Sequence, residues 1–324
     1  MIVLTAADTE ALLPMDQAIA VIEDVMRRVS AGGAELPLRF VVPVGGANLM
    51  GVMAGALDAP HVHGVKLVSL YPGNPARGLS SHRGAMVLFE AETGGAVAMM
   101  DAGPLTAIRT AAASAVATRA LARADAATLT LVGYGEQAEH HLNAMRAVRP
   151  INHVIVTGRD TSRAEAFAAS ARARHPGLRV DASGDVAGAV GSADIICTVT
   201  AAAEPVVMGD WLRPGQHLNI VGASVATKRE VDDTVVERSA IWVDYRASAL
   251  AQAGEIIAAL EAGRRRPEDL HEIGEVLAGA APGRSSPDQI SAYRSLGIAA
   301  QDLAAAAHIL TRAQTEGRGQ TVTL

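Results

Sequence analysis

The sequence predicts an α/β protein with two domains: a Rossmann dinucleotide-binding domain and an α+β domain with a mostly antiparallel sheet. Residues 127–160 carry the first prediction, because they read as a buried strand, a glycine-rich turn, a helix and a second buried strand. Residues 1–102 carry the second, because short strand-like runs alternate there with Gly, Pro, Asn and Ser clusters. We place the boundary after residue 112, with residues 113–295 in the Rossmann domain and residues 296–324 completing the first domain.

Composition narrows the class of protein. The 324 residues are 49% hydrophobic and 19% charged, which is typical of a globular chain with room for two cores. The net charge of −6 argues against a nucleic-acid partner. The single cysteine, Cys197, lies in an apolar run and is expected in the core, and it excludes an internal disulfide. No basic leader or long apolar run is present, so we expect a cytoplasmic protein without a membrane partner.

The first domain begins with an amphipathic helix at residues 15–30, which stops at a pair of glycines. A long Ala-rich helix at residues 106–123 leads into the second domain. Between them we expect strands at residues 36–42, 49–54, 64–70, 85–89 and 96–100.

The glycine-rich turn follows the strand at residues 128–132 and has the pattern Gly-x-Gly-x-x-Ala. Gly133 permits the tight turn, Gly135 lets the backbone approach a pyrophosphate, and Ala138 lets the helix lie close to the strand. The helix N-terminus then offers free N–H groups to phosphate. Further elements are expected as strands at 154–157, 195–199, 217–221 and 241–243, and as helices at 161–174 and 297–314.

The end of the second Rossmann strand bears on the choice of dinucleotide. An acid there suits the ribose hydroxyls of NAD, whereas arginine suits the 2′-phosphate of NADP. Arg159 comes first and Arg163 follows one turn later, so we favour NADP, while Asp160 keeps NAD possible. Val199 and Thr200 end a strand where Rossmann folds place cofactor loops, although a simple strand end explains them equally well.

Three cations lie in apolar surroundings. Arg39 and Lys66 are within strand-like runs, and Arg109 begins the Ala-rich helix. Charges in such settings are seldom buried without a partner. A bound carboxylate would pair with them. The alternative is an internal salt bridge to Glu35, Asp58 or Asp101.

The histidines give weaker signals. His61 and His63 share one face of a strand, but no third metal ligand accompanies them, so no metal site is predicted. His140 and His141 follow the glycine turn and are interpreted as surface or packing residues.

The sequence resembles the ornithine cyclodeaminase/mu-crystallin family, and its motifs are most similar to the mu-crystallin-like ketimine reductases. The resemblance runs from about residue 36 to the last helix. The segments that carry it are LPLRF at 36–40, GVKLV at 64–68, SHRG at 81–84, TAIRTAAAS at 106–114, GYGEQA at 133–138, ADIICTVT at 193–200, GQHLNIVGAS at 215–224, REVD at 229–232 and RSLGIA at 294–299.

The resemblance implies a homodimer in which the first domain dimerises and supplies substrate contacts, while the second binds NAD(P). Family members hold the substrate carboxylate with residues that match Arg39, Lys66 and Arg109, and Lys66 could also give a proton to the imine nitrogen. Lys66 and Arg109 are thus the candidate catalytic residues. With the motif residues, the candidate cofactor contacts are Ser81, His82, Arg109, Gly133, Tyr134, Gly135, Glu136, Gln137, Arg159, Asp160, Arg163, Val199, Thr200, Ser224 and Ser295.

One departure from the family pattern separates its activities. Cyclodeaminases and related alanine dehydrogenases carry an acid–base Asp where this chain has Ser224. A hydroxyl is too weak a base to replace a carboxylate, which argues against ornithine cyclodeamination but leaves imine reduction untouched.

The favoured prediction is therefore an NAD(P)H-dependent reductase of carboxylated cyclic ketimines, such as pyrroline-2-carboxylate or piperideine-2-carboxylate. Three alternatives stay open. The chain could be an amino-acid dehydrogenase or a cyclodeaminase of the same family. It could also be a protein that binds NADPH and a small carboxylate without turnover.

Overall fold

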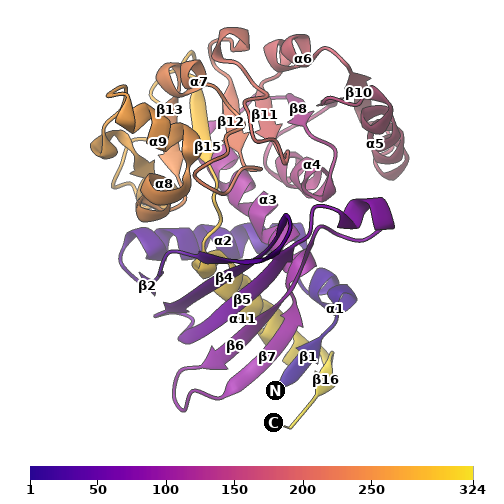
Figure 1. The fold of residues 1–324 in the computed structure, drawn as a ribbon, viewed down its shortest axis with the longest axis vertical. Helices are drawn as coiled ribbons and strands as arrows, with labels where there is room; N and C mark the ends of the chain where they lie inside the picture. The colour runs from indigo at the N-terminus through magenta and orange to yellow at the C-terminus, as the bar shows by residue number, and fades with distance from the viewer. Residues whose placement is uncertain (324) are drawn as a thin grey trace. The chain divides into compact units, whose positions relative to one another are not determined.

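The chain folds into two compact units (Figure 1). The structure is a computed structural model that describes residues 1–323, with the exception of the Pro75 side chain. The first unit comprises Met1–Ala112 and the C-terminal segment from Ile298, and the second comprises Ala113–Gly297. One unit is built on a mostly antiparallel sheet and the other on a parallel sheet, so the predicted fold class is confirmed.

The first unit contains an eight-stranded sheet. Its strands are β1 (Ile2–Leu4), β2 (Ala34–Glu35), β3 (Phe40–Gly45), β4 (Asn48–Leu57), β5 (Val62–Leu70), β6 (His82–Glu90), β7 (Ala96–Asp101) and β16 (Gln320–Thr321). They lie in the order β16-β1-β7-β6-β5-β4-β2, and β3 also pairs with β4. Every pairing is antiparallel except that of β1 with β7. The helices are α1 (Ala6–Ala11), α2 (Met15–Ser30), α11 (Ala299–Glu316) and the first part of α3 (Ala102–Leu121), with a short 3-10 turn η1 (Asn74–Arg77).

Two glycines let α11 lie close against this sheet. A Cβ added to Gly55 would lie 3.2 Å from the Ala299 Cβ, and one added to Gly64 would lie 3.0 Å from a Leu303 methyl. A larger side chain at either strand position would push the helix away. The close approach brings the buried face of α11 onto the core side of β4, β5 and β6.

That core side is apolar with one exception. A single cross-strand row joins Met53, Lys66, Met86 and Met100 on four neighbouring strands. All four side chains are buried. Lys66 therefore stands among methionines, in a position where a charge needs a partner.

The predicted strand at 36–42 is wrong in its limits. The chain forms β2 earlier, leaves the sheet at residues 36–39, and begins β3 only at Phe40. Pro37 explains the break, because proline gives no N–H to a strand ladder. Arg39 consequently lies just before β3 rather than within a strand.

The second unit contains an eight-stranded sheet in which every pairing is parallel. Its order is β10-β9-β8-β11-β12-β15-β13-β14, which reverses direction between β8 and β11. Ligands of such sheets bind beyond the carboxyl ends of the strands at this switch point. The strands are β8 (Thr128–Val132), β9 (His153–Thr157), β10 (Arg179–Ser183), β11 (Ile195–Thr198), β12 (His217–Ile220), β13 (Ala240–Val243), β14 (His271–Glu272) and β15 (Ser291–Arg294).

Helices connect these strands. They are α4 (Glu136–Val148), α5 (Thr161–Arg174), α6 (Val186–Ser192), α7 (Asp233–Arg238), α8 (Arg246–Gln252), α9 (Gly254–Glu261) and α10 (Ile273–Leu277), with short 3-10 turns η2 (Gly209–Trp211) and η3 (Pro267–Asp269). The predicted Cys197 position is confirmed: the residue is fully buried in β11, and burial raises the pKa of its thiol to about 12.

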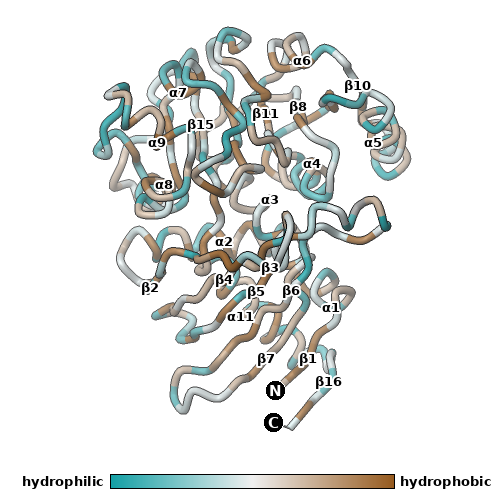
Figure 2. Tube along the Cα trace, viewed as in Figure 1, coloured by the Kyte–Doolittle hydropathy of each residue, from teal (hydrophilic) through white to brown (hydrophobic). Residues whose placement is uncertain are grey.

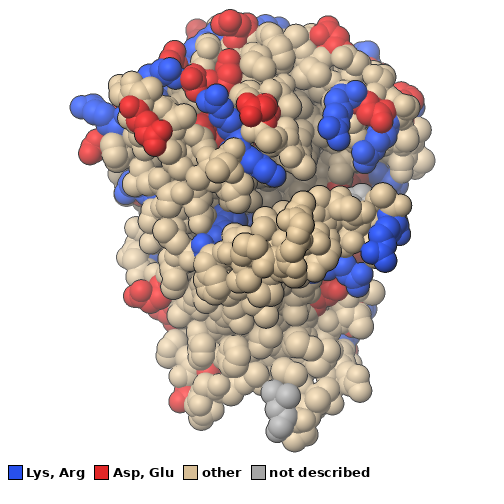
Figure 3. Space-filling model, viewed as in Figure 1, with Lys and Arg blue, Asp and Glu red and all other residues tan. Residues whose placement is uncertain are grey.

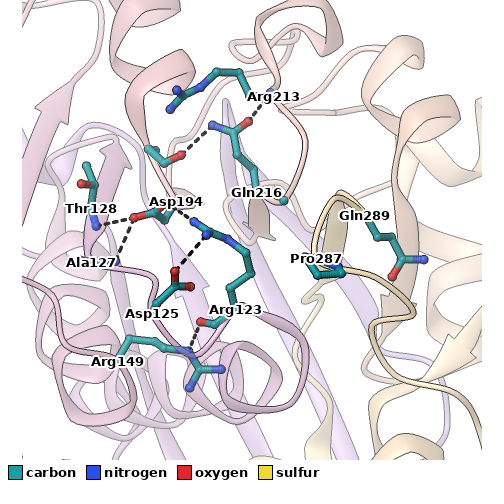
Figure 4. Close-up of polar contacts among 12 residues, drawn as sticks. Arg123, Asp125, Ala127, Thr128, Arg149, Asp194, Arg213, Gln216, Pro287 and Gln289 are labelled. Carbon is teal, nitrogen blue, oxygen red and sulfur yellow. Dashed lines mark hydrogen bonds and ion pairs between the residues drawn. The ribbon is translucent and has the colours of Figure 1, made fainter.

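The amino end of β8 is fastened by one carboxylate (Figure 4). Asp194 accepts hydrogen bonds from the backbone N–H groups of Ala127 (2.9 Å) and Thr128 (3.0 Å), and it also pairs with Arg123. These bonds lie at the end of the strand opposite the glycine turn. They hold β8 in register, so that the turn at its carboxyl end has a fixed support.

Within residues 1–323, no helix has both the length and the apolar character needed to cross a membrane. The same residues contain no group of three or more His, Cys, Asp or Glu side chains arranged for a metal ion.

Candidate active site

Two of the predicted substrate-binding cations meet at one carboxylate in the first unit. Lys66 Nζ on β5 lies 2.8 Å from Asp302 Oδ1, and Arg109 Nε on α3 lies 2.9 Å from the same oxygen. Arg109 Nη1 also donates to the Gln301 side chain (2.8 Å), and Lys66 Nζ donates to the Thr106 hydroxyl at 3.3 Å. The packing of α11 against β5, together with the contacts that α3 makes with both elements, thus brings two cations and one anion together in a buried cluster.

The cluster changes the proton affinity of its lysine. Burial, followed by the charge of Arg109, lowers the pKa of Lys66 from its usual value to about 7. Asp302 opposes this change, whereas Arg39 adds to it. Lys66 can therefore exchange a proton near neutral pH, which an ordinary lysine does not do.

The alternative of an internal salt bridge named the wrong acids for Lys66 and Arg109: Asp302, rather than Glu35, Asp58 or Asp101, pairs with both. Sequence reasoning missed Asp302, which lies 193 positions from Arg109. A signal was present, since Asp302 and Gln301 interrupt the Ala-rich run of α11 on its buried face.

The predicted pair Ser81 and His82 lies near the start of β6 in the same unit. Ser81 Oγ is 3.0 Å from His82 Nδ1, so the hydroxyl and the imidazole orient each other. The preceding Ser80 hydroxyl accepts a hydrogen bond from the His82 backbone N–H at 3.1 Å. Both candidate residues are partly or largely exposed, as a cofactor contact would require.

In the second unit, the glycine-rich turn has the geometry that its sequence predicts. Gly133 has a φ of 115°, and a Cβ there would lie 2.8 Å from the Val199 carbonyl oxygen. Gly135 begins α4 without any side-chain cap, and the space where its Cβ would stand is open. The first turn of α4 thus offers N–H groups and an open approach, which fits a dinucleotide pyrophosphate. Gln137 lies in this first turn, and its side-chain oxygen is buried without a hydrogen bond among the described residues.

The charged residues after β9 divide into two roles. Asp160 caps α5: its carboxylate accepts from the Arg163 N–H (3.1 Å) and the Ser162 hydroxyl (2.8 Å), and these bonds lower its pKa. Tyr134 lies beside them, because its hydroxyl accepts from the Asp160 N–H at 3.1 Å and the Arg163 guanidinium stacks on its ring at 5.0 Å. Arg159 is exposed at the strand end.

A buried glutamate, Glu230, joins the loops that follow β11 and β12. One oxygen accepts from the Thr200 N–H (2.8 Å) and hydroxyl (2.7 Å), and the other accepts from the Thr198 hydroxyl (2.9 Å) and the Gly222 N–H (2.5 Å). Four donors therefore satisfy one carboxylate that is fully buried. Glu230 lies in the REVD segment, yet sequence reasoning assigned it no role.

The remaining predicted cofactor residues lie beyond neighbouring strand ends. Ser224 follows β12 and is half-buried, and Glu136 is exposed at the start of α4. Ser295 follows β15, and its buried hydroxyl has no hydrogen-bond partner among the described residues. An unsatisfied buried hydroxyl at this edge of a parallel sheet suits a ligand contact.

Comparison with known proteins gives consistent matches. The sequence model of the ornithine cyclodeaminase/mu-crystallin family matches residues 1–317. The chain is 36% identical over 276 residues to the ketimine reductase mu-crystallin of Rattus norvegicus, covering 85% of this chain and 84% of the relative.

Two solved structures share the whole fold. The Δ1-pyrroline-2-carboxylate reductase of Thermococcus litoralis, in complex with NADH and L-proline, has a TM-score of 0.95 and 32% identity over 99% of this chain and 100% of that one. An archaeal alanine dehydrogenase dimer with bound NAD has a TM-score of 0.93 and 31% identity over 100% of this chain and 99% of that one.

Proposed function

Because the chain belongs to the ornithine cyclodeaminase/mu-crystallin family, we propose that it is an NAD(P)H-dependent reductase of carboxylated imines. The proposed substrates are cyclic ketimines such as pyrroline-2-carboxylate or piperideine-2-carboxylate. The observation that carries the proposal is the buried pairing of Lys66 and Arg109, which combines a carboxylate-binding cation with a lysine that exchanges its proton near neutral pH. The relative from Thermococcus litoralis, named for pyrroline-2-carboxylate, supports the choice of ring.

The residues of the cluster supply what imine reduction requires. When bound, a reduced nicotinamide would supply the hydride for the imine carbon. Lys66 gives one proton to the imine nitrogen, so that the C=N bond becomes CH–NH, and neutral Lys66 regains a proton from solvent. Arg109 and Arg39 hold the substrate carboxylate; Arg109 has its Nη2 group available, since only Nε and Nη1 donate to described residues.

The second unit fits the dinucleotide. The uncapped first turn of α4 and the open side of Gly135 would hold the pyrophosphate. We propose NADP as the preferred cofactor, because Arg159 is exposed at the end of β9 while the Asp160 carboxylate is occupied as a helix cap. The relatives with bound NADH and NAD make the second dinucleotide the alternative.

A second candidate is an amino-acid dehydrogenase, because of the likeness to the archaeal alanine dehydrogenase. That reaction needs a group to activate water and to manage ammonia. Ser224 offers only a hydroxyl, so imine reduction is favoured.

We propose a homodimer built on the sheet of the first unit. All six residues of β3 are exposed, among them Phe40 (59%) and Val44 (48%), and Leu67 on β5 adds to the same apolar surface. The hydrophobic character of these strands is visible in Figure 2, and the surface over them carries few charges in Figure 3. Monomers rarely expose a continuous apolar patch of this kind. The alanine dehydrogenase relative is a dimer, which supports the proposal.

The function is tested by following NADPH and NADH oxidation with each cyclic ketimine, using wild type and Arg109→Ala. We expect turnover by wild type and a loss on the order of 100-fold in kcat/KM for the variant, because one cation of a buried carboxylate site is removed. Arg119→Ala, an exposed position on the same helix, is the matched control and should retain wild-type kinetics.

Wild-type protein that binds NADPH tightly but reduces neither ring would overturn the cyclic-ketimine proposal and favour binding without turnover. Oxidation of alanine with NAD would instead favour the dehydrogenase. For the dimer, Val42→Asp combined with Val44→Asp should halve the mass measured by light scattering. A wild-type protein of about 33 kDa in that measurement would contradict the dimer.

A further inference from the structure

The Asp302 carboxylate holds the Lys66–Arg109 pair through a single oxygen. Both cations bind Oδ1, at 2.8 and 2.9 Å, while Oδ2 is buried and has no hydrogen bond among the described residues. All three side chains are at most 5% exposed. Burying these charges is costly unless they compensate each other. We therefore expect the Asp302 carboxylate to influence the position of both cations and the charge state of Lys66.

The charge balance of the cluster is uneven. Lys66 and Arg109 bring two positive charges, Arg39 acts on Lys66 from the segment before β3, and Asp302 is the anion that faces them from α11. Without Asp302, the charged groups of the described residues that act on Lys66 would be the two guanidinium groups of Arg39 and Arg109, until a substrate carboxylate arrived. The neutral form of the lysine would then be favoured, and it has no proton to give.

We propose that Asp302 is a positioning residue for imine reduction: its Oδ1 atom holds Lys66 Nζ beside Arg109 and keeps Lys66 in the charged form that donates the proton. This inference rests on the proposed function. The step itself is unchanged: a bound reduced nicotinamide would supply the hydride for the imine carbon, the Lys66 proton would go to nitrogen, and Asp302 would take no part in either transfer. Because Asp302 competes with the substrate carboxylate for the same cations, its removal should strengthen substrate binding while it weakens proton transfer.

The kinetic test compares wild type with Asp302→Asn. In the pH profile of kcat, the decline on the alkaline side should shift to lower pH by at least about one unit. As a result, kcat at pH 7.5 should fall about 10-fold. The KM for the imine should stay the same or decrease. The matched control is Glu272→Gln, which removes a buried carboxylate at the β14 edge of the second unit's sheet: we expect a lower melting temperature, with no shift in the pH dependence of kcat.

The sequence offers a direct view of the lysine, because it has only two lysines, Lys66 and Lys228. With 13C-labelled lysine, the spectrum contains two Cε signals, and Lys66→Met assigns them. In Asp302→Asn the Lys66 signal should titrate at lower pH than in wild type, while Lys228 stays unchanged. If Asp302→Asn does not fold, Asp302→Glu displaces the carboxylate by one methylene, and the Lys66 titration and the alkaline decline of kcat should shift together.

Two outcomes would overturn the inference. One is a folded Asp302→Asn protein with wild-type kcat and no shift in its alkaline decline. The other is an Asp302→Glu protein in which the Lys66 titration moves while the alkaline decline of kcat does not. Failure of the proposed function is distinct, since wild type itself would then reduce neither ketimine with either dinucleotide.

Discussion

Lys66 Nζ lies 2.8 Å from Asp302 Oδ1, although 236 residues separate the two in sequence. The contact depends on how closely α11 approaches the sheet. Gly64, two residues before Lys66, leaves the space that a Leu303 methyl occupies. Gly64 on β5 thereby helps to set the distance between Lys66 and Asp302, and that distance influences the proton affinity of the lysine.

Replacing Lys66 with methionine should abolish imine reduction without destabilising the fold. Arg109 still pairs with Asp302 in the variant, and methionine matches the neighbouring side chains of the core row. Removing one partner of a buried ion pair is costly chiefly because the other charge is left unpaired, and here Arg109 remains as the partner of Asp302, so we expect that cost to be avoided. Urea unfolding measures the free energy of unfolding, and ketimine-dependent NADPH oxidation measures activity.

The same variant tests the pKa of Lys66. The folded-state pKa of about 7 is below the ordinary value of 10.5, so between these values the unfolded chain binds more protons. The free energy of unfolding of wild type should therefore gain a rising contribution from pH 7 towards pH 10, which Lys66→Met lacks. Lys228→Met is the control and should retain the rise. Equal pH slopes in wild type and Lys66→Met would contradict the assignment.

The glycine turn and the strands beside it could be predicted because their signals are local. Residues 128–132 and 161–174 match β8 and α5 in both limits, and Gly133 adopts the positive φ that the pattern requires. Short edge elements were missed, among them β1, β10 and β16. Their pairing depends on distant partners rather than on their own sequence.

The cluster shows the same limit at the level of a site. Apolar surroundings identified Lys66 and Arg109 as cations in need of an anion, for which a bound carboxylate was predicted and nearby acids were the alternative. The anion instead comes from the last helix, and only the folded chain brings Asp302 to them. Glu230 was missed for a similar reason, because its donors come from two loops that are separate in sequence.

Glu230→Gln should weaken dinucleotide binding more than it affects the imine. An amide cannot accept all four hydrogen bonds that the carboxylate now receives, so the loops after β11 and β12 lose part of their attachment. We expect about a 10-fold rise in the Kd for NADPH, measured by fluorescence titration, with the KM for the imine changed less than twofold.

The control for this variant is Glu272→Gln. Glu272 is also a buried glutamate of the second unit, but it accepts from the Arg246 N–H at the far edge of the sheet. Its replacement should lower the melting temperature and leave the Kd for NADPH unchanged. If both variants lose stability and neither alters the Kd, Glu230 supports the fold alone.

Arg159→Ala should discriminate between the two dinucleotides. Its exposed guanidinium is the group that would meet a 2′-phosphate, which NADH lacks. We expect the KM for NADPH to rise about 10-fold and the KM for NADH to stay within twofold. Arg179→Ala is a suitable control. Arg179 is the first residue of the neighbouring strand β10 and pairs with the first residue of β9, so it lies at the amino ends of the strands, whereas Arg159 follows the carboxyl end of β9. An unchanged KM for NADPH would remove the support for NADP.

Acid should destabilise the second unit through two buried histidines. Burial lowers the pKa of His141 to about 4 and that of His217 to about 3, so both are neutral in the folded chain at pH values where the unfolded chain is protonated. The free energy of unfolding should therefore fall as the pH drops below about 6.5, by roughly 2 kcal/mol for each histidine between pH 7 and pH 5. Urea unfolding at both pH values measures the loss.

His217→Gln isolates one of these contributions. The variant removes a titrating group whose Nδ1 lies 2.9 Å from the Ser291 hydroxyl, and an amide can retain a hydrogen bond there. Its absolute stability at pH 7 should decrease, but the difference between pH 7 and pH 5 should shrink by about half. His61→Gln changes an exposed histidine and should keep the full difference. If His217→Gln also kept it, acid would act through other groups, of which the carboxylates of the ion pairs come first.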